Sequence, residues 1–174
     1  MLALTDPRWA SLGPFFGEGA DIPRAIERWL GSMGTDAEQD AYFDHLFELF
    51  LHQETITDAA IAVVPWLMHA CTQLETRHRA MYLAHVAMVE ANRLEYGVPR
   101  SAAGSAGLFD DLMPDYRAAI GQARAMADDL IGLRPEDATE HGLVALRPAL
   151  HGDAGLAWKQ WHDDWKSKSA RASD

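Results

Sequence analysis

Between residues 45 and 54 lies the cluster of side chains best suited to chemistry. His45, Glu48 and His52 follow spacings that put them on one wedge of a helix. Gln53 and Glu54 come next. Histidines and carboxylates are ligands for zinc and other transition metals. However, two helical turns, about 10 Å, separate the two histidines, so one ion at about 2 Å from each ligand cannot easily bridge them. We therefore expect no bound metal or cofactor.

Two readings of this cluster remain open. It is a solvated polar face on which His52 and Gln53 cap the last carbonyls of the helix. Alternatively, it contacts a ligand or a partner, with Glu48 and Glu54 contributing negative charge. The second reading makes all five residues candidate binding residues.

A second polar stripe consists of His78, His85 and Asn92, which are seven residues apart and bordered by Met81 and Met88. A polar line flanked by apolar residues suits a row of hydrogen bonds between helices, or the lining of a groove. His78 and His85 therefore join the candidate binding residues. We assign no catalytic role to any residue of the two groups.

Three tryptophans, Trp158, Trp161 and Trp165, share one face of the last expected helix. Aromatic residues at this spacing predict a buried face that closes an open core. If the face is exposed, it is instead an interaction site.

The composition indicates a globular chain, with 48% hydrophobic and 24% charged residues. The net charge of −11 repels phosphate backbones and anionic lipids, so we expect no nucleic acid or membrane partner, and a basic protein is the favoured partner. The single cysteine, Cys71, excludes an intramolecular disulfide and is expected to be a packed thiol. The longest apolar run, 59–71, is shorter than the roughly 20 residues of a membrane span. Because the start of the chain lacks signal-peptide features, a cytoplasmic location is expected.

Helix-capping signals recur along the chain, and alternating strand patterns do not. We expect an all-α fold of about seven to nine helices, forming a single domain over residues 1–168 with a frayed tail at 169–174. Thr35 and Glu38 form a capping-box pattern, and Gly97 is expected to end a helix. The expected helices span 7–13, 21–31, 35–52, 57–71, 76–96, 110–131 with a bend or restart at Pro114, 135–150, and a last segment from 153 or 155.

The core is expected where two of these helices are apolar over most of their circumference. The residues expected to be largely buried are Phe43, Phe47, Phe50, Val63, Trp66 and Leu67.

Three prolines that follow apolar residues, Pro23, Pro65 and Pro114, mark a possible internal repeat. They are 42 and 49 residues apart, and a glycine-rich stretch at 98–107 accounts for the longer interval. A period in the forties with two helices per unit is typical of HEAT and armadillo repeats. An irregular helical bundle is the alternative.

A distinctive set of residues and short motifs lies between residues 9 and 70. It consists of Trp9, Leu12, Ala20-Asp21-Ile22-Pro23, His52-Gln53, Ala59-Ala60 and Ala62-Val63-Val64-Pro65-Trp66-Leu67. With these residues the first part of the chain resembles a group of bacterial HEAT-like repeat proteins of unassigned function. The resemblance implies an α-α superhelix of HEAT-like helix pairs, but no reaction. Members of the group often have glycine after His-Gln, where this chain has Glu54.

These observations favour a protein-binding helical repeat module, regulatory or immunity-type, with a basic partner. One alternative is a small-molecule or metal-dependent enzyme that uses the His45/Glu48/His52 or the His78/His85 group. Another is a structural unit that self-associates through its C-terminal tryptophans. Motifs for nucleotide binding and for a serine nucleophile are absent from the sequence.

Overall fold

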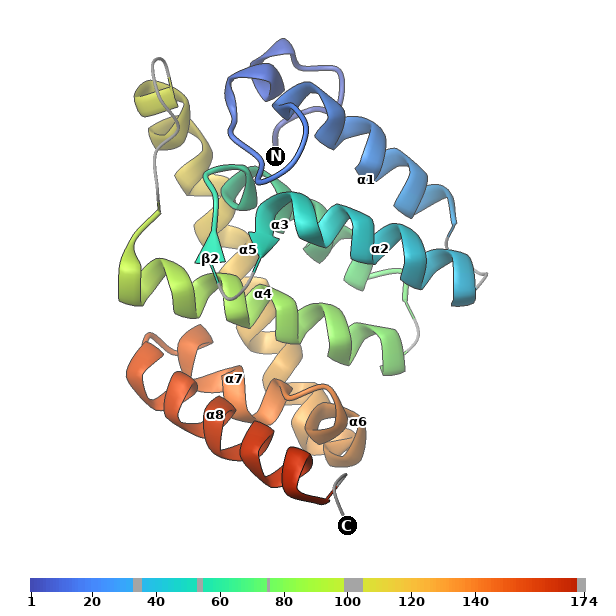
Figure 1. Ribbon diagram of the computed structural model, residues 1–174, viewed down its shortest axis with the longest axis vertical. Coiled ribbons are helices and arrows are strands. Elements are labelled where there is room, and N and C mark those ends of the chain that lie inside the picture. Colours follow the sequence, from blue (N-terminus) through green and yellow to red (C-terminus); the bar gives the residue numbers. More distant parts are fainter. Residues whose placement is uncertain (33–35, 53–54, 75, 99–104, 172–174) are drawn as a thin grey trace. The chain divides into compact units, whose positions relative to one another are not determined.

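The structure, a computed structural model, confirms the all-α prediction (Figure 1). It describes residues 1–32, 36–52, 55–74, 76–98 and 105–171. Over these residues it is 79% helical, with eight α-helices and one two-stranded sheet. Thr35, Gln53 and Glu54, and residues 99–104 of the glycine-rich stretch, lie outside the described residues. The chain divides into two compact units, unit 1 of residues 1–72 and 98–119, and unit 2 of residues 73–97 and 120–174.

Unit 1 begins with two short 3₁₀ helices, η1 (Pro7–Ser11) and η2 (Gly19–Asp21). They lead into α1 (Ile22–Gly31), which buries Ile22, Ile26 and Trp29 on one face. Pro23 is well placed in the first turn of α1, because an amide there has no acceptor within the helix. The ring of Trp29 lies 5.7 Å from the ring of Phe43 in α2 (Asp36–Phe50), so these two helices pack together.

A short hairpin follows α2, where the sequence predicted helix as far as His52. Leu51–His52 form β1, which pairs antiparallel with β2 (Thr55–Ile56). The Thr57 amide donates to the Phe50 carbonyl at 3.1 Å, which extends the pairing to the end of α2. The hairpin places Leu51 opposite Ile56 and buries both side chains, an arrangement that a continued helix would not produce. It leads into α3 (Ala59–Cys71), where Cys71 is buried as expected.

Most of the expected core is confirmed. Four of the six residues are fully buried, namely Phe43, Phe50, Val63 and Leu67. Phe47 is partly buried, and its ring packs edge-on against Phe50 at 5.6 Å. Trp66 is also partly buried, and its indole N–H donates to the Leu2 carbonyl at 3.1 Å.

One helix, α5 (Ser105–Leu133), runs uninterrupted through Pro114 and belongs to unit 1 up to Ala119. The expected restart at Pro114 is therefore wrong. Pro114 is exposed, and water at an exposed site can replace the hydrogen bond that proline cannot donate. The helix also begins before the expected Asp110.

Unit 2 contains α4 (Thr76–Tyr96), the second part of α5, α6 (Pro135–Glu140), α7 (Leu143–Leu150) and α8 (Ala154–Arg171). The bounds of α4 and the positive φ of Gly97, 76°, are as predicted. The single helix expected over 135–150 is instead broken at Gly142, which has a φ of 74°. A Cβ at Gly142 would lie 2.4 Å from a ring carbon of Trp161, so both the backbone and the packing require glycine. The last helix reaches Arg171, into the tail expected to fray.

The three repeat prolines occupy different places in their helices. Pro23 lies in the first turn of α1, whereas Pro65 and Pro114 lie inside α3 and α5. Within each unit, neighbouring helices nevertheless form packed pairs, α1 with α2 and α7 with α8.

Candidate functional site

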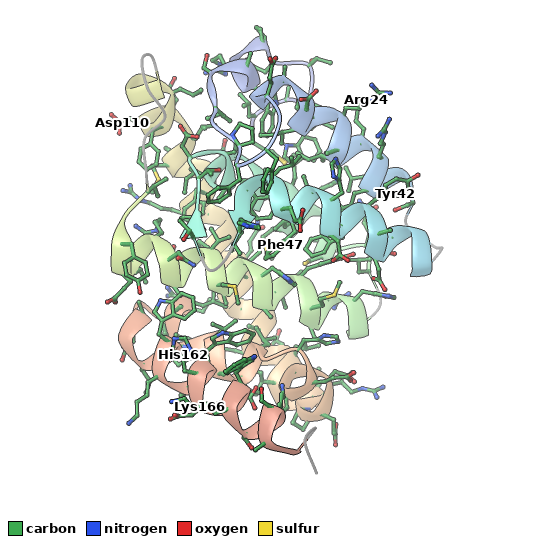
Figure 2. All side chains as sticks on the ribbon, in the orientation of Figure 1. Arg24, Tyr42, Phe47, Asp110, His162 and Lys166 are labelled. Atoms are coloured by element: carbon green, nitrogen blue, oxygen red, sulfur yellow. The ribbon has the colours of Figure 1, made fainter. Side chains whose placement is uncertain are left out.

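The exposed face of α2 carries the predicted residues His45 and Glu48. Asp40, Asp44 and Glu48 follow one another at intervals of four residues, so they form a stripe along the helix, and all three are exposed. Tyr42, which is labelled in Figure 2, is 39% exposed. It lies two residues from both Asp40 and Asp44, so it projects from another side of α2 and does not belong to the stripe. We call Asp40, Asp44 and Glu48 the acidic face of α2.

His52 does not share this face, because α2 ends at Phe50. The prediction that His45, Glu48 and His52 share one wedge of a helix is therefore wrong. Gln53, the second residue of the predicted helix-end cap, lies outside the described residues. His52 lies in β1, and its ring packs against two aromatic rings of the preceding loop. The centroid distances are 5.9 Å to Phe15 and 5.2 Å to Phe16, the latter edge-to-face. His52 thus holds the loop against the hairpin.

The loop between η1 and η2 is fixed to the helices by backbone hydrogen bonds. The Phe15 amide donates to the Leu49 carbonyl of α2 at 2.8 Å. The Gly13 amide donates to the buried carboxylate of Asp58, just before α3, at 2.7 Å. At Gly19 a Cβ would lie 2.1 Å from the Trp9 carbonyl oxygen, so only glycine fits between the two 3₁₀ helices. The loop is therefore a fixed wall.

This wall and the facing sides of α1 and α2 line an open pocket of about 230 Å³. Its lining combines two guanidinium groups, an imidazole, a carboxylate and apolar side chains. The lining residues are Phe16, Gly17, Asp21, Arg24, Ala25, Arg28, His45 and Leu49. The Arg24 side chain on α1 extends outward in Figure 2. Among the predicted site residues that the structure describes, only His45 lines this pocket.

The two arginines were not among the predicted site residues. Arg24 and Arg28 are one turn apart in IPRAIER, which places them on the same side of α1. That spacing was the available signal. It passed unnoticed because the pocket residues at 16–28 and 45–49 come together only in the tertiary structure. Within the described part of the chain, neither guanidinium forms a hydrogen bond or an ion pair.

The stripe on α4 is used largely for bonds within its own helix. The His85 ring nitrogen Nδ1 donates to the Met81 carbonyl at 2.7 Å, and Asn92 donates to the Met88 carbonyl at 3.0 Å. Burial lowers the pKa of His85 to about 4, the Met81 carbonyl opposes this shift, and nearby His141 adds to it. His85 is thus neutral at pH 7 with its proton on Nδ1. His78 is partly buried.

The tryptophans of α8 confirm the predicted cap only in part. Trp158 is buried and its ring stacks on His162 at 5.9 Å, and Trp161 packs against Gly142. Trp165 is 61% exposed, so it does not belong to the buried face.

No group of three histidine, cysteine or acidic side chains within the described ranges is arranged to hold a metal ion. None of the helices described is both long and apolar enough to cross a membrane. No protein-family model, no curated protein and no solved structure matches the chain.

Proposed function

We propose that this chain is a helical protein-binding module, regulatory or immunity-type, that docks a basic partner on the acidic face of α2. The observation that carries the proposal is the exposed stripe of Asp40, Asp44 and Glu48. Carboxylates at a binding surface select partners of opposite charge.

The distribution of charge along the chain supports this surface. Unit 1 contains fourteen Asp and Glu residues against five Arg, whereas unit 2 contains twelve against ten basic residues. The excess negative charge thus belongs mostly to the unit that carries the acidic face. A field of this kind accelerates the encounter with a basic protein at low ionic strength and weakens as salt screens it.

The packed pairs of helices, α1 with α2 and α7 with α8, support a HEAT-like architecture as part of the proposal. In such repeats each pair buries its apolar face on its neighbours and leaves one helix face free for binding. A cytoplasmic location also belongs to the proposal. The enzyme alternative has less support, because His52 packs on Phe15 and Phe16, and His85 bonds to its own helix.

The test uses a fluorescently labelled helical peptide rich in lysine and arginine, titrated with the protein at low and at physiological salt. The variant Asp40→Asn/Asp44→Asn/Glu48→Gln removes the charges of the acidic face. Three rim charges at about 0.5 kcal/mol each correspond to about a ten-fold loss of affinity. Tyr42→Ala should leave peptide binding unchanged, because Tyr42 lies on another side of α2 from the acidic face.

A matched control removes two Asp and one Glu charges from exposed positions of unit 2, in Asp129→Asn/Asp163→Asn/Glu95→Gln. This control should bind the peptide nearly as the wild type does. Equal losses in the two triple variants would mean that only net charge attracts the peptide, and the proposed surface would be wrong.

A further inference from the structure

The side chains of the pocket between α1 and α2 suit a different class of ligand than the acidic face of α2 does. Arg24 and Arg28 project from neighbouring turns of α1, and His45 approaches from α2. Two like charges at this spacing repel each other slightly, and an anion between them removes that repulsion. Arginine presents planar N–H donors that match a carboxylate, and His45 offers a further N–H.

Arg24 and Arg28 are both exposed, and their guanidinium groups are accessible to an external anion. Unit 1 holds almost three acidic residues for each basic one, so an arginine there has many carboxylates within its own unit. Arg8, for example, pairs with Asp6 at 2.8 Å. Arg24 and Arg28 have no such partner among the residues that the structure describes, although both line a pocket.

The other lining residues indicate which further chemical groups the ligand should carry. Asp21, the last residue of η2, precedes Arg24 by three residues and lines the same pocket. One of its oxygens accepts the Glu18 amide at 3.0 Å, and the other is left for a donor or a cation. Phe16, which is 50% exposed, and Leu49 provide apolar surface. The pocket lining therefore brings together two guanidinium groups, a carboxylate oxygen and apolar surface.

We propose that this pocket binds a small zwitterion, an α-amino acid with an apolar side chain. Its carboxylate lies between Arg24 and Arg28, its ammonium group faces Asp21, and its side chain packs on Phe16 and Leu49. The volume of about 230 Å³ is below the roughly 300 Å³ at which pockets for drug-sized ligands begin, so a single amino acid is the appropriate size. The fixed loop pre-forms the wall, which lowers the entropic cost of binding.

The experiment measures binding of L-leucine, L-leucinamide, N-acetyl-L-leucine and inorganic phosphate to the full chain by calorimetry and ligand-observed NMR. L-Leucine should bind, and both blocked derivatives should bind at least ten-fold more weakly, because each lacks one charge. Arg24→Gln and Arg28→Gln should each weaken L-leucine binding at least ten-fold. Their melting temperatures should stay at the wild-type value, since neither guanidinium bonds to the described chain.

Two further variants separate this site from a general effect of charge. Arg117→Gln removes the same charge from an exposed position of α5 and should leave binding unchanged. Asp21→Asn keeps an oxygen for the Glu18 amide, so it should weaken L-leucine but not N-acetyl-L-leucine. Absence of L-leucine binding would overturn the proposal. Equal binding of L-leucine and N-acetyl-L-leucine, or of L-leucine and phosphate, would also overturn it. None of these outcomes would affect the proposal for the acidic face, which the peptide titration tests separately.

Discussion

Acidification should destabilise the protein through one side chain, His85. Burial lowers its pKa from 6.5 to about 4 in the folded protein. Above pH 6.5 the ring is neutral in both the folded and the unfolded chain, so the full stability is present. Between pH 6.5 and 4 the unfolded chain binds a proton that the folded chain does not bind, and the free energy of unfolding falls as the pH falls. Below pH 4 both states are protonated and the loss stops growing.

The size of this loss follows from the two pKa values. Each pH unit between them is worth 1.36 kcal/mol, so the whole interval amounts to about 3 kcal/mol. That is a large part of the roughly 5–15 kcal/mol that stabilises a typical domain.

Urea unfolding at a series of pH values between 7.5 and about 4 measures this loss. Because the carboxylates also titrate, the informative quantity is the difference between the wild type and His85→Gln, which keeps an N–H donor for the Met81 carbonyl. That difference should change by about 3 kcal/mol in favour of the variant as the pH falls. Parallel curves for the two proteins would refute the reasoning. His141→Gln should raise the pKa of His85, as measured by NMR titration of the ring proton.

Three further predictions concern the fold, and urea unfolding measures each of them. Gly142→Ala should lower the free energy of unfolding by more than the about 1–2 kcal/mol that a left-handed backbone costs, because the new Cβ also meets the Trp161 ring. In a Trp161→Ala background only the backbone strain should remain. Identical losses in both backgrounds would contradict the contact between residue 142 and Trp161. Phe50→Ala should lower the free energy of unfolding by about 3–5 kcal/mol, and Phe47→Ala should lower it by less because Phe47 is only partly buried. The reverse order would contradict the burial of these two side chains. Asp58→Ala should cost about 1–3 kcal/mol because it leaves a loop amide without its acceptor, and an unchanged stability would contradict the anchoring of the loop.

Helices whose signals are local could be predicted from the sequence. The bounds of α4, Thr76–Tyr96, and the glycine that ends it were predicted correctly, because capping and apolar periodicity act within a few residues. The start of α1 and the end of α3 were predicted to within one residue for the same reason. Burial of Phe43 and Phe50 followed from the apolar arc of their helix.

Features that depend on contacts between distant segments could not be predicted in this way. The residues after Phe50 continue the apolar pattern of α2, yet they form a hairpin that buries Leu51 and Ile56. Likewise, the break at Gly142 accompanies the approach of Trp161, nineteen residues later. In both places the gain from packing exceeds the local preference for continuing a helix.

The candidate sites also combine features that local sequence determines with features that depend on tertiary contacts. The sequence by itself determined the acidic stripe of α2, because Asp40, Asp44 and Glu48 lie on one helix at a spacing that fixes their common face. It also placed Arg24 and Arg28 one turn apart. Only the tertiary structure placed those arginines opposite His45 and moved His52 off the helix to pack on the loop. The helical repeat sets the positions of side chains within one helix, whereas the meeting of two helices and a loop depends on burial of apolar surface along the whole unit.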